Sequence, residues 1–151
     1  LTWGSPSNPP VLLCHGKLDT CSGFRPLVSL LPACFYYWSW TPCPRTTPGR
    51  AHDRLTFDQR MKEVTILPFS ADSLQQLYTT TRTPTFCVLA KRILDAGVYD
   101  PVPFIKDEAA WPNNNYRVKV VEGWHDVHIS DPGCMADDVA RFLMADLKVK
   151  L

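Results

Sequence analysis

The sequence predicts an α/β fold organised around a partial, doubly wound parallel sheet. Two short apolar runs, residues 11–14 and 86–90, have the length of buried strands, and residues 116–121 supply another predicted strand. Segments with helical spacing of apolar residues lie between and after these runs, and strands that alternate with helices are typical of parallel sheets. A chain of 151 residues suits one domain with its own core.

The first predicted unit is a strand, a glycine turn and a helix. Two prolines precede the strand at residues 11–14, and Gly16 follows it and allows a sharp turn. Apolar residues then recur at helical spacing over residues 24–31, where Pro26 is tolerated in the first turn. Pro32 ends this helix.

Four further elements are predicted in the second half of the chain. Ser70 is a suitable N-cap for a helix over residues 71–78, and strands are predicted at 86–90 and 116–121. A final helix follows Asp131 as N-cap and Pro132 as the first helical residue. We expect this helix to bury five apolar residues at three- and four-residue spacings, namely Met135, Val139, Phe142, Leu143 and Leu147.

Residues 33–54 have no helical or strand periodicity. Five aromatic residues fall within residues 35–40, and a proline-rich stretch follows them. We therefore assign no element here. A shifted reading frame or a misjoined exon would explain the stretch, and together with the lack of an initiator Met it suggests a fragment or an incomplete gene model.

Composition excludes several classes of protein. The 16 Lys and Arg residues balance 15 Asp and Glu residues and are scattered, so nucleic acid is not the expected partner. No run of 18 apolar residues is present, so we expect no membrane span. The six cysteines lack C-x-x-C spacing, and Cys14 and Cys87 lie in apolar runs. We interpret them as buried free thiols in a reducing compartment, with three disulfides as the alternative.

Two stretches carry a family resemblance. Residues 3–32, "WGSPSNPPVLLCHGKLDTCSGFRPLVSLLP", and residues 118–143, "VKVVEGWHDVHISDPGCMADDVARFL", resemble the serine hydrolase-like branch of the α/β-hydrolase-fold superfamily. The resemblance implies hydrolysis of an ester-like or related acyl bond in a small molecule, through Ser, His and Asp and without a cofactor. It also implies one incomplete domain over residues 1–151, with an oxyanion-loop unit at 1–32, an aberrant stretch at 33–54 and C-terminal αβ units at 55–151.

The resemblance assigns site residues at both ends of the chain. His15-Gly16-Lys17 matches the oxyanion loop, where the Lys17 amide would stabilise the negative oxygen of acyl transfer; a plain turn is the alternative. His125 matches the general base, because it follows Gly123 by two residues and precedes Pro132 by seven, and His128 matches a structural histidine. Imidazole suits the role of base because its unperturbed pKa lies near neutrality. Either histidine could instead be an ordinary loop residue. We expect Lys17 and His125 to flank one crevice at the carboxyl edge of the sheet.

The acid of the triad is expected just after the strand at residues 85–91. Asp100 is favoured because "GVYD" resembles the family's G-x-F-D segment, and Asp95 is the runner-up; a solvated loop aspartate explains either one equally well.

The nucleophile is missing. A nucleophile elbow needs G-x-S-x-G, and no two of the seven glycines are four residues apart. Ser22 falls in the oxyanion loop, and we do not assign it as the nucleophile. We therefore predict a fold without the nucleophile-elbow strand and helix, and a chain that is inactive or nearly so.

Two other classes remain open. A metal-binding domain would use His125, His128 and Cys134, with His15 or Cys14 as a fourth ligand, although the spacing fits no closed zinc pattern and we predict no metal. A non-catalytic interaction module would self-associate through an exposed sheet edge. We expect a cytoplasmic protein, with the peroxisome as an alternative because Val149-Lys150-Leu151 resembles a degenerate S-K-L signal.

Overall fold

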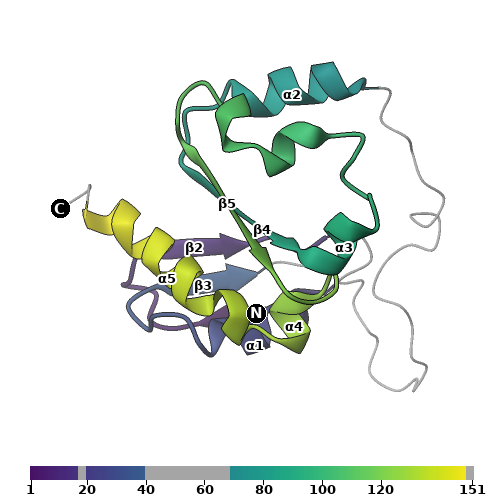
Figure 1. The fold of residues 1–151 in the computed structure, drawn as a ribbon. Helices are drawn as coiled ribbons and strands as arrows, with labels where there is room; N and C mark the ends of the chain where they lie inside the picture. Colours follow the sequence, from purple (N-terminus) through teal and green to yellow (C-terminus); the bar gives the residue numbers. More distant parts are fainter. Residues whose placement is uncertain (17–19, 40–68, 149–151) are drawn as a thin grey trace, which may run out of the picture. The chain divides into compact units, whose positions relative to one another are not determined.

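The computed structural model describes residues 1–16, 20–39 and 69–148. It is a mixed α/β structure with two small sheets, each of which contains a parallel pair of strands, so the predicted α/β class is confirmed (Figure 1). The chain divides into two compact units, Leu1–Ile66 and Leu67–Leu151. Each unit is described by itself below, and the expectation of one incomplete domain stays a prediction.

The first unit contains a three-stranded sheet. Its strands are β1 (Thr2–Trp3), β2 (Pro10–Leu13) and β3 (Tyr36–Ser39), in the order β1-β3-β2. β2 runs parallel to β3, whereas β1 is antiparallel to β3. β2 lies one residue earlier than the run predicted from the sequence.

β3 corrects the prediction that residues 33–54 hold no element. Tyr37 and Ser39 are buried and Trp38 is exposed, which is the alternation of a strand. The Tyr37 hydroxyl donates a hydrogen bond to the Pro32 carbonyl at 2.8 Å, and Ser39 Oγ donates to the Leu13 carbonyl at 2.8 Å. The aromatic residues therefore form a strand because they have high β propensity and a partner strand to pair with.

The connection from β2 to β3 is helical, but shorter than predicted. A 3₁₀-helix, Cys21–Phe24, leads into α1 (Arg25–Val28), which buries Leu27 and Val28. The next residues form tighter turns, with the Leu31 amide donating to the Val28 carbonyl at 3.2 Å. The predicted helix over residues 24–31 thus ends early, because its last turn winds as 3₁₀ before Pro32.

The second unit contains the parallel pair predicted from the two apolar runs. β4 (Thr85–Ala90) and β5 (Tyr116–Val121) pair in parallel along their whole length, with Thr85 opposite Tyr116 and Ala90 opposite Val121. The two strands lie side by side in Figure 1. Both predicted strands are confirmed.

Both faces of this pair are covered, as expected for a parallel sheet. On one face the Phe86 ring packs against the Phe142 ring of α5 (Gly133–Lys148), with the centroids 5.7 Å apart. On the other face, Cys87 and Val118 pack against an aromatic cluster.

We define the aromatic cluster as Phe104, Trp111 and Tyr116, all buried. The Trp111 and Tyr116 rings stack with centroids 4.1 Å apart and planes at 2°. Their polar atoms are satisfied, since Trp111 Nε1 donates to the Phe104 carbonyl at 3.1 Å and Tyr116 Oη donates to the Ile105 carbonyl at 2.8 Å. Burial raises the pKa of Tyr116, so its hydroxyl stays a neutral donor.

Phe104 and Trp111 come from the segment between β4 and β5, Tyr116 comes from β5, and α2 (Ala71–Thr79) packs against the cluster. That segment includes two 3₁₀-helices, Pro103–Lys106 and Glu108–Ala110. The predicted α2 and its cap are confirmed, because Ser70 Oγ accepts a hydrogen bond from the Ser73 amide at 3.2 Å. Leu74 of α2 packs against the cluster.

α5 begins one residue later than predicted. The Ala136 amide donates to the Pro132 carbonyl, so the first helical residue is Gly133. Met135 and Ala136 are buried, and the side chain of Leu147 lies outside the described residues. A salt bridge between Lys119 of β5 and Asp138 of α5 joins the helix to the sheet.

The cysteines are more exposed than predicted. Cys14 and Cys34 are exposed and Cys87 and Cys134 are half-buried; Cys14, Cys87 and Cys134 are free thiols. Cys14 is exposed because it comes just after the last residue of β2. In the part of the chain that the structure describes, no helix is long and apolar enough to cross a bilayer.

Candidate functional site

The candidate site lies at the carboxyl end of the β4–β5 pair. Ala90 and Val121 are the last paired residues of the two strands, so the segments that follow them start at the same sheet edge. α3 (Lys91–Asp95) follows β4, and a turn over residues 122–126 followed by α4 (Val127–Ser130) follows β5 (Figure 1). The carboxyl edge of a parallel sheet is where α/β proteins place ligands and reacting groups.

The turn that carries His125 depends on Gly123. This glycine has φ +130°, and a Cβ built on it would lie 2.5 Å from Val127 Cγ1. Only glycine fits a backbone with positive φ and so close a neighbour. The histidine turn, which we define as residues 122–126, therefore has a fixed course between β5 and α4, and it presents His125 exposed.

Two contacts join the histidine turn to the start of α3. The Arg92 amide donates a hydrogen bond to the Gly123 carbonyl at 3.2 Å. The Arg92 guanidinium carbon lies 5.3 Å from the centroid of the Trp124 ring, which is the distance of a cation–π contact. Trp124 is 59% exposed, so solvent weakens this contact.

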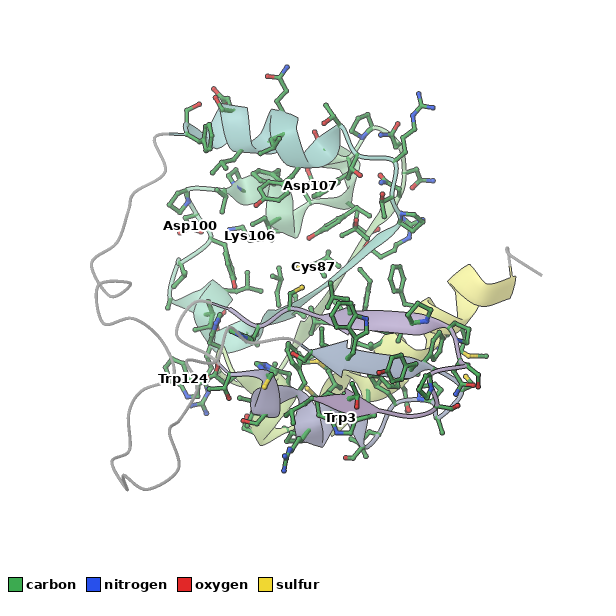
Figure 2. All side chains as sticks on the ribbon, turned by 180° about the vertical axis from the view of Figure 1, so that it is seen from behind. Trp3, Cys87, Asp100, Lys106, Asp107 and Trp124 are labelled. Carbon is green, nitrogen blue, oxygen red and sulfur yellow. The ribbon has the colours of Figure 1, made fainter. Side chains whose placement is uncertain are left out.

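Neither candidate acid is bonded to His125. Asp100 forms an ion pair with Lys106 at 2.9 Å, and Asp95 accepts two hydrogen bonds from Lys91, at 2.9 and 2.7 Å. Figure 2 draws Trp124, the neighbour of His125, well apart from Asp100 and Lys106. Among the described residues no hydrogen bond or ion pair joins His125 to a carboxylate or a serine, so the roles of Asp100 and Asp95 stay predictions.

The charges at this edge form a local ion-pair set. Lys91 is paired with Asp95, and its pKa is raised by the hydrogen bond with Asp95, by the charge of Asp95 and, to a smaller extent, by the charge of Glu122. Lys91 is thus held positive at the point where β4 ends. Arg92 adds a second cation next to it.

His128 lies within α4 and is half-buried, and its neighbour Val127 is fully buried. This position agrees with the expectation of a structural histidine, which stays a prediction.

The turn that follows β2, residues 14–16, belongs to the first unit. β2 ends at Leu13, and His15 Nδ1 is 2.9 Å from the Gly16 carbonyl oxygen. A Cβ added to Gly16 would meet nothing within 4 Å, so the glycine has open space around it. Lys17, the expected amide donor, lies outside the described residues.

The predicted alternative of a metal centre finds no geometric support. In residues 1–16, 20–39 and 69–148 no group of three or more His, Cys, Asp or Glu side chains is placed to hold an ion. His125, His128 and Cys134 are all within these ranges, so they do not form the ligand set that their spacing allowed.

The sequence did not predict the contact between Arg92 and Trp124 at this edge. The residues are 32 positions apart in the chain, and no periodicity relates them. The pairing of β4 with β5 brings them together, so the available signal was the parallel register of the two strands.

These features define a protein with a parallel βαβ pair and an exposed histidine at its carboxyl edge. One segment of 35 residues is 57% identical to the human serine hydrolase-like protein, and it covers 23% of this chain and 17% of that protein. A segment of the same length is 57% identical to human serine hydrolase-like protein 2, and one is 54% identical to the mouse serine hydrolase-like protein; each covers 11% of the relative.

The matches confirm, over that segment, the similarity to serine hydrolase-like proteins that the sequence indicated. The aligned part spans between about a sixth and a ninth of these relatives' length. No protein-family model matches the chain, and no solved structure matches it.

Proposed function

We propose that this chain is an incomplete serine hydrolase-like protein of the α/β-hydrolase fold. The family reaction is the hydrolysis of an ester-like or related acyl bond in a small molecule, and the sequence holds no G-x-S-x-G motif that would supply its nucleophile. The observation that carries the proposal is the histidine turn that follows β5, next to the segment that follows its parallel partner β4. A triad places its base and its acid in two such neighbouring segments.

His125 is the group that we assign to proton transfer. Its ring is exposed at a sheet edge, where it can take a proton from a nucleophile or from water. In a complete triad a carboxylate holds the imidazole in one tautomer, and losing that contact costs about four orders of magnitude in kcat. The ion pairs of Asp95 with Lys91 and of Asp100 with Lys106 would have to open before either carboxylate could take this role.

The missing nucleophile sets the expected activity. Removing the attacking residue of a serine hydrolase costs about six orders of magnitude in kcat, because oxyanion stabilisation and binding alone remain. We therefore expect negligible turnover from this chain, with any residual rate due to His125 acting on water or on an activated ester.

The test is p-nitrophenyl acetate hydrolysis by the full chain and by two single variants, His125→Ala and His128→Ala. We expect a rate close to that of buffer for the wild type, and we expect His125→Ala, but not His128→Ala, to remove any excess over buffer. Equal excess rates in wild type and His125→Ala would exclude His125 from the reaction. Fast, saturable turnover would contradict the missing nucleophile.

A second candidate is a non-catalytic module that binds a second copy of this chain. Leu12 and Trp38 are neighbours in the β2–β3 register and are 52% and 38% exposed, so apolar side chains lie open on one face of the first sheet. A net charge of +1 gives little repulsion between two copies. Sedimentation velocity should then show a concentration-dependent dimer that Leu12→Lys weakens, whereas a monomer at all concentrations would refute this candidate.

The cytoplasmic or peroxisomal location remains a proposal from the sequence. Imaging a fluorescent fusion with and without the last three residues tests it, since only a peroxisomal signal depends on that tripeptide.

A further inference from the structure

We infer that Arg92 is a positioning residue for the histidine turn, acting through Trp124 and Gly123. Arg92 is the second residue of α3, and α3 begins directly after β4 ends. It is thus fixed to the sheet edge from which the histidine turn also starts. The inference deepens the proposed function and rests on His125 being the base of that site.

Arg92 makes two independent contacts with the histidine turn. The backbone amide of Arg92 reaches the Gly123 carbonyl at 3.2 Å, and its side chain covers the Trp124 ring at 5.3 Å. Gly123 and Trp124 are the two residues before His125. Fixing both of them limits the directions that the His125 side chain can take.

The turn needs such support because its own sequence supplies little. Trp124 and His125 are exposed, and the buried side chains that flank the turn are Val121 before it and Val127 after it. The positive φ of Gly123 sets the bend, but a glycine adds no side-chain contact. Arg92 supplies the contact from outside the turn.

The neighbouring charges keep the Arg92 side chain available for this contact. The Lys91 ammonium forms an ion pair with the Asp95 carboxylate at 2.7 Å, so Asp95 is paired with its i−4 neighbour. The charge of Glu122 contributes to the raised pKa of Lys91. Arg92 can therefore turn its guanidinium toward the Trp124 ring, where its cation–π attraction is worth about two- to fivefold in an equilibrium at an exposed site.

The experiment measures amide hydrogen exchange of the full chain by NMR at the residue 92 amide, which donates to the Gly123 carbonyl. We expect Arg92→Met, which keeps an aliphatic stem but loses the charge, to raise exchange of this amide about two- to fivefold. Arg92→Lys restores at least half of the protection, because a cation again lies over the ring. Three-bond couplings of His125 should show one dominant χ1 rotamer in the wild type and in Arg92→Lys, and averaging in Arg92→Met.

The matched control is Arg141→Met, which removes an exposed arginine of α5 that pairs with Asp138. We expect it to leave exchange of the residue 92 amide and the His125 rotamer unchanged. Unchanged exchange and rotamer in Arg92→Met would overturn the inference, as would a failure of Arg92→Lys to restore either. The exchange and rotamer measurements do not depend on esterase activity. Equal excess rates of wild type and His125→Ala with p-nitrophenyl acetate would therefore reject the proposed role of His125, and the effect of Arg92 on the histidine turn could still be measured.

Discussion

Replacing Trp111 in the aromatic cluster should remove most of the stability of the second unit. Trp111 is 6% exposed, stacks on Tyr116 at 4.1 Å and donates a hydrogen bond to the Phe104 carbonyl. The stack contributes about 0.5–1.5 kcal/mol beyond burial, and the hydrogen bond contributes about 1 kcal/mol. With the cavity added, Trp111→Ala should cost about 3–5 kcal/mol of the free energy of unfolding.

Two further variants divide this cost. Trp111→Phe keeps a ring beside Tyr116 but leaves the Phe104 carbonyl without its donor, so it should cost about 1–3 kcal/mol. Trp124→Ala removes an exposed tryptophan of the same unit and should cost less than about 1 kcal/mol, the value of its cation–π contact.

The assay is urea unfolding followed through the NMR amide signals of β5, which report on the second unit alone. We expect the urea midpoint to be highest for Trp124→Ala, lower for Trp111→Phe and lowest for Trp111→Ala, with the slopes unchanged. A Trp111→Ala midpoint equal to that of Trp124→Ala would refute the claim that this cluster is the core of the unit.

Three other outcomes follow from single residues. Hydrogen bonding to Lys119 lowers the pKa of Asp138. The ionised carboxylate therefore adds to the free energy of unfolding above the ordinary aspartate pKa, and this stability is lost as the pH falls through the lowered pKa. Asp138→Asn should flatten the dependence of stability on pH over that window in acid unfolding curves. Burial raises the pKa of Tyr37 to about 12, so stability should fall as the pH rises above about 10, and Tyr37→Phe should remove that fall in alkaline unfolding curves. Gly123→Ala should cost more than about 1 kcal/mol because of its positive φ and its close contact with Val127, whereas Gly133→Ala should be near neutral; urea titrations of both compare them.

Strand positions followed from the sequence where an apolar run was long enough to fill a paired strand. β4 and β5 each have six residues and pack against other elements on both faces, so most of their positions are apolar and the strands are easily recognised. β3 has four residues, and its alternation covers one buried tyrosine and one buried serine. So short an alternation cannot be recognised among neighbouring aromatic residues. The pairing with β2 makes residues 36–39 a strand.

The candidate site was predictable in its location but not in its contacts. The loops after β4 and β5 share an edge because parallel strands in register must end together. The partners of the carboxylates depend on side-chain geometry: Asp95 pairs with Lys91 at i−4, a spacing visible in the sequence, whereas Asp100 pairs with Lys106 across a loop. The contact between Arg92 and Trp124 requires the register of both strands.

Labelling with a fluorophosphonate probe, followed by mass-spectrometric mapping, tests the central claim most directly. Such a probe reacts irreversibly with an activated serine and only slowly with ordinary hydroxyls. The account predicts no stoichiometric adduct on any serine of the folded full chain, with an active serine hydrolase labelled in parallel. A single serine that is labelled to completion, and whose labelling is lost in His125→Ala, would show that a working nucleophile is present and would contradict the account.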